Sequence, residues 1–170
     1  MNAMIFQAIN KVANTSKAID FIGLFFADYL LYIAGVAFIV ILFIKKTRLM
    51  AISIAVSVFL ARIIIAEPIK RIFHIARPYI SIDNVKKIIN ENGDYSSFPS
   101  GHTTIFFAIA MAIFYFNKKW GIAAFVVATL VGIARIYVGV HWPIDVVVGA
   151  LIGVLSGIVV NHFIIKKRNS

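Results

Sequence analysis

The chain has 170 residues, of which 61% are hydrophobic, and its mean hydropathy is +0.93. Soluble domains are about 45–50% apolar, so the composition excludes an ordinary soluble domain and predicts an all-α integral membrane protein. The formal net charge is +10, and the basic residues gather at the ends of apolar runs. That placement favours membrane orientation and contact with anionic lipid, rather than nucleic acid, as the reason for the charge.

Residues 1–18 predict an amphipathic helix that lies in the membrane interface and does not span the bilayer. Apolar side chains recur there at helical spacing, namely Met4, Ile5, Ala8, Ile9, Val12 and Ala13. Polar side chains fall on the opposite face, namely Gln7, Asn10, Lys11 and Asn14.

Apolar runs predict a bundle of about five transmembrane helices in a single domain over residues 1–170. The expected spans are about 19–44, 49–66, 102–116, 120–138 and 143–165. The third is short, because a bilayer needs about 20 helical residues. Either its polar start lies in a cavity below the membrane surface, or neighbouring helices shield it.

Clusters of basic residues follow the first, third and fifth spans: Lys45, Lys46 and Arg48; Lys118 and Lys119; Lys166, Lys167 and Arg168. With five spans these clusters share one side, which the positive-inside rule places in the cytoplasm. The loops 67–101 and 139–142 then face outward, toward the periplasm or exterior of a bacterial inner membrane. The outer loop 67–101 is itself basic, against the rule, which calls for a functional explanation.

Asp28 and Arg62 are charged residues in the outer halves of the first and second spans, where charges are costly and usually paired. We expect Asp28 to pair with Arg62, although Asp28 could instead steady another outer cation. Within the outer loop, Ile82, Val85, Ile88 and Ile89 form a short amphipathic stretch that could lie on the membrane surface over a site.

Three groups of polar residues fall on the outer side. Lys70 precedes Arg77-Pro78 by seven residues, about two helical turns, so both cations would face one way before Pro78 stops the helix. Pro99-Ser100-Gly101-His102 stands where an apolar helix begins, and its first N–H groups suit an anion. In that stretch Gly101 lets a ligand approach the backbone closely.

The third group is Arg135, His141 and Asp145, in which the carboxylate can accept the imidazole Nδ1 proton and leave Nε2 free. Each group alone could be a membrane anchor, a helix cap or a bystander. Together they favour a phosphate pocket, because Arg77, Arg135, Lys70, Ser100 and Gly101 offer donors and two histidines offer a nucleophile and an acid. Gly149, Gly153 and Gly157 continue the spacing of His141 and Asp145, so this face should turn into the bundle.

The three groups, in this order and membrane context, resemble the signature motifs of the type 2 phosphatidic acid phosphatase superfamily across residues 49–165. The third motif of that family often starts Ser-Arg, whereas Ala134 precedes Arg135 here. The family commonly has six spans, and the first is at most an interfacial helix in this chain. Neither difference removes a charged group from the motifs.

The resemblance implies that His141 attacks phosphorus to form a phosphohistidine and that Asp145 orients it. It implies that His102 protonates the leaving oxygen and then activates water, while Lys70, Arg77, Ser100, Gly101 and Arg135 hold the phosphoryl oxygens. It implies no cofactor or metal, and no His or carboxylate cluster has metal-site spacing. His74 could line the pocket rim, and His162 falls near the cytoplasmic end.

The short amino-terminal segment, the small size and the two-residue connection at Lys118-Lys119 resemble those of bacterial undecaprenyl-diphosphate phosphatases of the bacitracin-resistance type. The chain also resembles small bacterial lipid A 1-phosphatases and phosphatidylglycerophosphate phosphatases. We therefore expect a polyprenyl diphosphate, lipid A or another anionic phospholipid as substrate, with the polyprenyl diphosphate first. A transporter or lipid-binding protein that uses the same basic pocket is the main alternative. A vanadium haloperoxidase has similar motifs but is soluble, which the hydropathy argues against.

Overall fold

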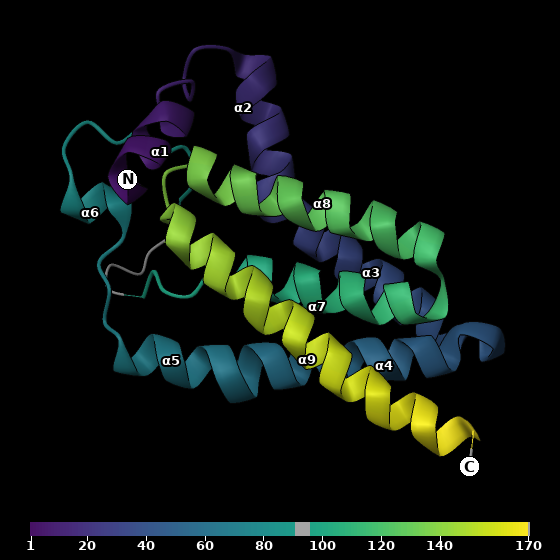
Figure 1. Cartoon of the computed structure of the whole chain (residues 1–170). Coiled ribbons are helices and arrows are strands. Elements are labelled where there is room, and N and C mark those ends of the chain that lie inside the picture. The colour runs from purple at the N-terminus through teal and green to yellow at the C-terminus, as the bar shows by residue number, and fades with distance from the viewer. Residues whose placement is uncertain (91–95, 170) are drawn as a thin grey trace.

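The computed structural model describes residues 1–90 and 96–169, with side chains up to residue 164 at the carboxyl end. All regular structure in this part of the chain is helical (Figure 1). The elements in chain order are α1 (Asn2–Asn10), α2 (Lys17–Leu24), η1 (Phe25–Tyr29), α3 (Leu30–Phe43), η2 (Lys45–Thr47), α4 (Arg48–Val58), η3 (Phe59–Ala66), α5 (Glu67–Ile72), α6 (Pro78–Ser81), α7 (Gly101–Phe116), α8 (Lys118–Tyr137) and α9 (Pro143–Asn169).

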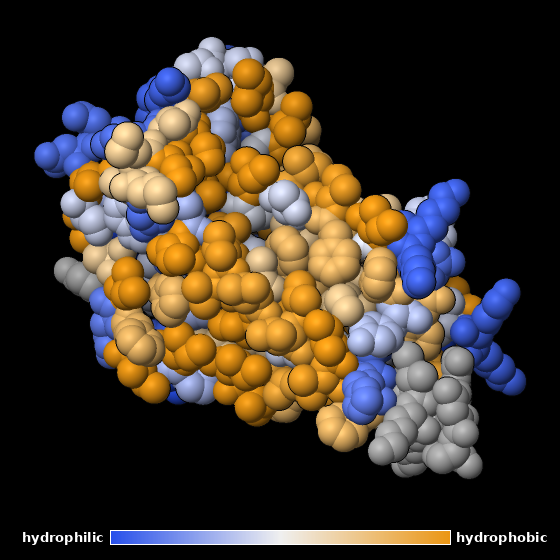
Figure 2. All heavy atoms as spheres, viewed as in Figure 1, coloured by the Kyte–Doolittle hydropathy of each residue, from blue (hydrophilic) through white to orange (hydrophobic). Residues whose placement is uncertain are grey.

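Four helical stretches are long and apolar enough to cross a membrane: Lys17–Phe43, Lys45–Ile72, Lys118–Tyr137 and Pro143–Ile164. Helix α7 is apolar but shorter, as the sequence predicts. The five together confirm the expected bundle with one additional amino-terminal helix. Figure 2 shows the result on one face of the molecule, a broad apolar belt with hydrophilic side chains gathered at both ends.

Helix α7 lies at the centre of the bundle, where it contacts α4, α8 and α9 (Figure 1). The glycines of α9 make this contact close. A Cβ atom at Gly149 would lie 2.7 Å from the Ser100 carbonyl oxygen, and one at Gly157 would lie 2.6 Å from Met111 Cβ. The predicted small-residue stripe therefore faces the bundle and brings the start of α9 against the start of α7.

Gly153→Ala should destabilise the protein, because the new Cβ would lie 2.5 Å from the Thr104 carbonyl oxygen and 2.8 Å from the Ala108 nitrogen. Overpacking against backbone costs about 1–3 kcal/mol, which thermal unfolding in detergent would detect as a lower Tm. The matched control is Gly35→Ala on α3, where nothing lies within 4 Å of the added atom. Equal Tm changes in the two variants would contradict the close packing of α7 on α9.

The second span is longer than predicted and ends differently. Its helix continues through Glu67 to Ile72, so Lys70 lies in α5 and the connecting loop begins after it. The expectation that Lys70 and Arg77 share one helix is wrong, and Pro78 begins α6 instead of stopping a helix. Helix α5 ends at Ile72, five residues before Arg77, and a proline also disfavours helical backbone in the residue before it. Arg77 is accordingly extended, with φ −69° and ψ 156°.

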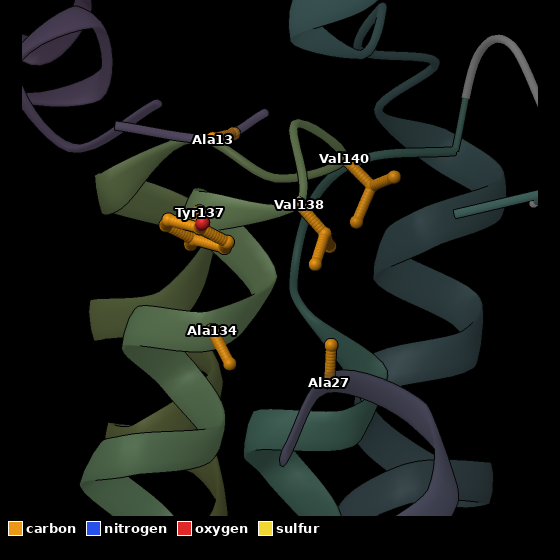
Figure 3. Close-up of a cluster of buried hydrophobic side chains, with 6 residues drawn as sticks. All are labelled: Ala13, Ala27, Ala134, Tyr137, Val138 and Val140. Atoms are coloured by element: carbon orange, nitrogen blue, oxygen red, sulfur yellow. The ribbon is translucent and has the colours of Figure 1, made fainter. Parts of the chain in front are cut away.

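The amphipathic stretch from Ile82 to Ile89 contains no regular helix, and its position at the membrane surface stays a prediction. Ile88 and Ile89 pack against a buried cluster around the end of α8, which Figure 3 shows. That cluster comprises Ala13, Ala27, Ala134, Tyr137, Val138 and Val140. The predicted outer loop also includes residues 91–95, and the third basic cluster includes the side chains of residues 166–168; both lie outside the described part.

Helix α1 ends at Asn10, earlier than predicted, and Asn10 is buried although it was expected on the polar face. Its amide donates to the carbonyl oxygens of Lys86, at 2.9 Å, and Tyr137, at 2.8 Å, and its Oδ1 accepts from Lys86 N at 2.9 Å. Met4 and Ile5 stay exposed, as an interfacial helix requires. Asn10 thus connects the end of α1 to the loop at Lys86 and to the end of α8 at Tyr137.

Candidate active site

The loop after α5 is held from two sides. Lys70 Nζ donates to the Ser96 carbonyl oxygen at 2.5 Å, which ties α5 to the segment that leads into α7. Arg77 is buried, and its Nη1 donates to the Val140 carbonyl oxygen at 3.2 Å. Lys70 therefore contacts the segment just before the second motif, and Arg77 contacts the loop of the third motif. Both contacts are to backbone oxygens of residues distant in the sequence, so no local pattern indicates them.

The second motif forms the start of α7. Ser100 occupies the N-cap with extended backbone, and Gly101 is the first helical residue, as predicted. The Ser100 N–H donates to the Asp145 carbonyl oxygen at 3.0 Å, and the Ser100 hydroxyl accepts from Thr103 Oγ1 at 3.0 Å. A Cβ atom at Gly101 would lie 2.9 Å from Arg62 Nε, so the guanidinium packs directly against this glycine and would have to shift for a larger residue.

The third motif spans the turn between α8 and α9. Arg135 is fully buried near the end of α8, and its Nη1 donates to the Ala27 carbonyl oxygen at 3.2 Å. His141 lies in the loop 138–142, and its Nδ1 is 3.4 Å from Asp145 Oδ2. Pro143 is the first residue of α9, as predicted. The carboxylate faces the imidazole from the first turn of the next helix.

Asp145 is itself fixed by neighbours. Its Oδ2 accepts from the Ser97 hydroxyl at 2.5 Å and from the Trp142 N–H at 2.8 Å. Ser97 is fully buried, and its N–H donates to the Ile75 carbonyl oxygen at 3.1 Å. Ser97 was not predicted as a site residue, because it lies outside the three motifs and 48 residues before Asp145.

A pocket of about 580 Å³ opens beside these groups. Five predicted residues line it: Lys70, Arg77, Gly101, His102 and His141. Ser100, Arg135 and Asp145 are fully buried behind that lining. The remaining lining residues are Leu31, Arg62, Glu67, Arg71, His74, Ser96 and Ile105, of which only His74 was expected at the rim.

The expected pair of Asp28 and Arg62 is not formed. Arg62 Nη1 pairs with Glu67 Oε2 at 2.5 Å instead. Arg62 lies in the π-helical segment η3, where the backbone bonds residues five apart, and Glu67 follows it by five positions. A helical period of 3.6 residues does not indicate a π-helical turn, so this pair could not be predicted from the sequence.

Charge in the pocket suits an anion. Among the described residues, no three His, Asp or Glu side chains are grouped as metal ligands. The pKa of His141 lies well below its ordinary value of 6.5, chiefly because of burial. Nearby positive charges lower it further, those of Arg135, Arg77, Lys70 and His102. The imidazole is therefore neutral at pH 7, which is the form that can act as a nucleophile.

The low pKa predicts how the protein responds to acid. An unfolded His141 takes up a proton near pH 6.5, whereas the folded one stays neutral to a lower pH. Stability should consequently fall as pH drops below 6.5 toward the folded pKa, and this contribution should be constant above it. NMR of ¹³C-labelled histidines in detergent, assigned with the His141→Ala variant, would follow the titration. A midpoint for His141 at or above 6.5 would contradict the burial and charges described.

Comparisons with known proteins agree with this geometry. The sequence profile of the PAP2 superfamily matches residues 48–169. The bacitracin transport permease protein BcrC of Bacillus licheniformis is 37% identical over 94% of this chain and 79% of its own length. An undecaprenyl-diphosphatase of Sulfolobus acidocaldarius is 32% identical over 89% of this chain and 73% of its own length.

Solved structures show the same fold. The crystal structure of Aquifex aeolicus LpxE has a TM-score of 0.82 and 30% sequence identity, covering 95% of this chain and 94% of that one. A transmembrane PAP2-type phosphatidylglycerolphosphate phosphatase of Bacillus subtilis has a TM-score of 0.65 and 26% identity, covering 98% and 88%. With its profile match, its relatives and these folds, the chain belongs to the PAP2 superfamily of membrane lipid phosphatases.

Proposed function

We propose that the protein removes the terminal phosphate from a lipid diphosphate, with undecaprenyl diphosphate as the preferred class of substrate. Two of the relatives named above support this choice, since one is an undecaprenyl-diphosphatase and both align over most of this chain. The observation that carries the proposal is the neutral, buried His141 at the wall of a cationic pocket. Binding alone needs no oriented imidazole, which argues against a transporter or a lipid-binding protein.

In the proposed reaction, His141 Nε2 attacks the terminal phosphorus and forms a phosphohistidine. Asp145, 3.4 Å from Nδ1, holds the ring and stabilises the charge that it acquires. Lys70, Arg77, Arg135, Ser100 and the Gly101 N–H hold the phosphoryl oxygens and stabilise five-coordinate phosphorus. His102 protonates the leaving oxygen and then activates the water that releases phosphate. No resident metal or cofactor takes part.

The proposed location is the bacterial inner membrane, with the pocket on the periplasmic or outer side. The distribution of charge supports this orientation. Lys46, which follows α3, lines a second cavity together with Asn117 and Trp120, which flank Lys118 and Lys119 at the start of α8. Figure 1 shows this end of the bundle opposite the turn between α8 and α9. Positive-inside orientation would place that end in the cytoplasm. Labelling of single cysteines, introduced into this cysteine-free chain at each end, would test the orientation.

A lipid A phosphatase is the second candidate, because a lipid A 4′-phosphatase of Porphyromonas gingivalis is 30% identical over 86% of this chain and 64% of its own length. The deciding experiment compares undecaprenyl diphosphate, lipid A, phosphatidylglycerophosphate and phosphatidic acid with purified protein in detergent and excess chelator. The proposal predicts phosphate release with the highest kcat/KM on undecaprenyl diphosphate. A preference for lipid A would favour the second candidate, and a requirement for added metal would contradict the mechanism.

A further inference from the structure

One wall of the pocket carries a carboxylate, although the proposed substrate is an anion. Glu67 lines the pocket, and both its oxygens are occupied. Oε2 pairs with Arg62 Nη1 at 2.5 Å, and Oε1 pairs with Arg71 Nε at 3.3 Å. One carboxylate between two guanidiniums leaves a net positive charge and fixes the arginines along the wall. These residues lie outside the three motifs, and the proposed mechanism does not use them.

Arg62 lies close to the reaction centre. Its Nε would be 2.9 Å from a Cβ atom at Gly101, so the guanidinium rests against the first turn of α7 beside His102. Side-chain exposure is 27% for Arg62 and 28% for Glu67, which leaves both reachable from the pocket. The π-helical turn of η3 aligns the two residues, and such turns often occur at functional sites.

The pocket lining combines cations with apolar side chains. His141, Lys70 and Arg77 line it together with Leu31 and Ile105, which offer an apolar surface suited to a lipid. Arg62 lies against Gly101, whose N–H is proposed to hold the terminal phosphoryl group. A group held by Arg62 would therefore lie next to that phosphate in the same pocket.

We propose that Arg62, positioned by Glu67 and assisted by Arg71, forms a second phosphate subsite that binds the inner phosphate of a diphosphate substrate. This inference rests on the proposed function. As the terminal phosphorus bonds to His141, its bond to the bridging oxygen breaks. The electron pair stays on that oxygen, which carries increased negative charge in the transition state until His102 protonates it and the lipid monophosphate leaves. A forked guanidinium stabilises that charge, whereas a monophosphate substrate has no inner phosphate to offer Arg62.

Farnesyl diphosphate and farnesyl monophosphate provide the test, since they share a tail and differ by one phosphate. The measured quantity is kcat/KM for the diphosphate divided by kcat/KM for the monophosphate, from phosphate release in detergent with chelator. Loss of a charge-assisted contact made by only one substrate should lower this ratio about tenfold or more in Arg62→Gln. Arg62→Lys keeps the positive charge and loses the forked pair of donors, so it should lower the ratio less. This variant replaces Arg62→Gln in the test if the glutamine variant does not fold.

Two further variants sharpen the result. Glu67→Gln should lower the ratio by less than Arg62→Gln, because Arg62 keeps its charge and loses only its positioning partner. Lys87→Gln removes the same charge from a residue that instead packs over Tyr79, so it controls for general electrostatics. Its ratio should equal that of the parent protein.

The inference is overturned if Arg62→Gln slows both substrates by the same factor, or if Lys87→Gln changes the ratio equally. A parent protein that hydrolyses only the monophosphate also overturns the subsite while leaving a lipid phosphatase. A parent protein that releases phosphate from neither substrate, nor from the four lipids compared above, contradicts the proposed function itself.

Discussion

His141→Ala is expected to lower kcat for phosphate release from a lipid diphosphate by roughly 10³-fold or more, because it removes the proposed nucleophile. His141 is buried, and its Nδ1 lies 3.4 Å from the buried Asp145 carboxylate. The remaining cations would still bind substrate, so KM should change far less than kcat. Steady-state kinetics with farnesyl diphosphate would separate the two constants.

The matched control is His162→Ala, the same substitution on an exposed face of α9 outside the pocket lining. It should leave kcat within error of the parent value. Thermal unfolding of both variants distinguishes lost chemistry from lost structure, since His141 is buried and its removal leaves a cavity. A folded His141→Ala protein that still turns over at the parent rate would exclude the nucleophile role.

Asp145→Asn should produce the second largest loss, about 10²–10⁴-fold in kcat by analogy with other oriented histidines. Oδ2 faces His141 Nδ1 and also accepts from Ser97 and the Trp142 N–H, so an asparagine oxygen in that place keeps these contacts. The substitution removes the negative charge that stabilises the positive imidazole ring of the phosphohistidine, and this loss of charge lowers kcat.

Ser97→Ala is the control for this second substitution. It removes one hydrogen bond to Asp145 and keeps the carboxylate charge beside His141. We expect a loss of about tenfold or less, because one hydrogen bond is worth about 0.5–1.5 kcal/mol. If the alanine variant lost as much activity as Asp145→Asn, then positioning by Ser97, and not the charge of Asp145, would govern the rate.

Features with a local cause could be predicted from the sequence. Hydropathy located the five apolar helices, since a bilayer requires long uninterrupted runs. The start of α7 at Ser100 and Gly101 could be located because the polar loop gives way there to an apolar run. Pro143 starts α9 because proline is favoured at the first position of a helix, and Gly153 faces α7 because small residues let helices approach.

Features that depend on contacts between residues far apart in the chain could not be predicted from the sequence. Asn10 holds Lys86, 76 positions away, and Lys70 holds the backbone of Ser96, so no periodicity marks either contact. The pairing of Arg62 with Glu67 needs a π-helical turn, which a helical period of 3.6 residues does not describe. The placement of Lys70 and Arg77 on one helix failed because the backbone becomes extended before Pro78.

The most direct test of the catalytic mechanism uses farnesyl diphosphate labelled with ³²P in the terminal phosphate. Turnover is quenched in alkali, which preserves phosphohistidine, and the labelled peptide is identified by mass spectrometry. We predict acid-labile label on His141 in the parent protein and its absence in His141→Ala. Label on any other residue, or undiminished labelling of His141→Ala, would contradict a phosphohistidine at this position.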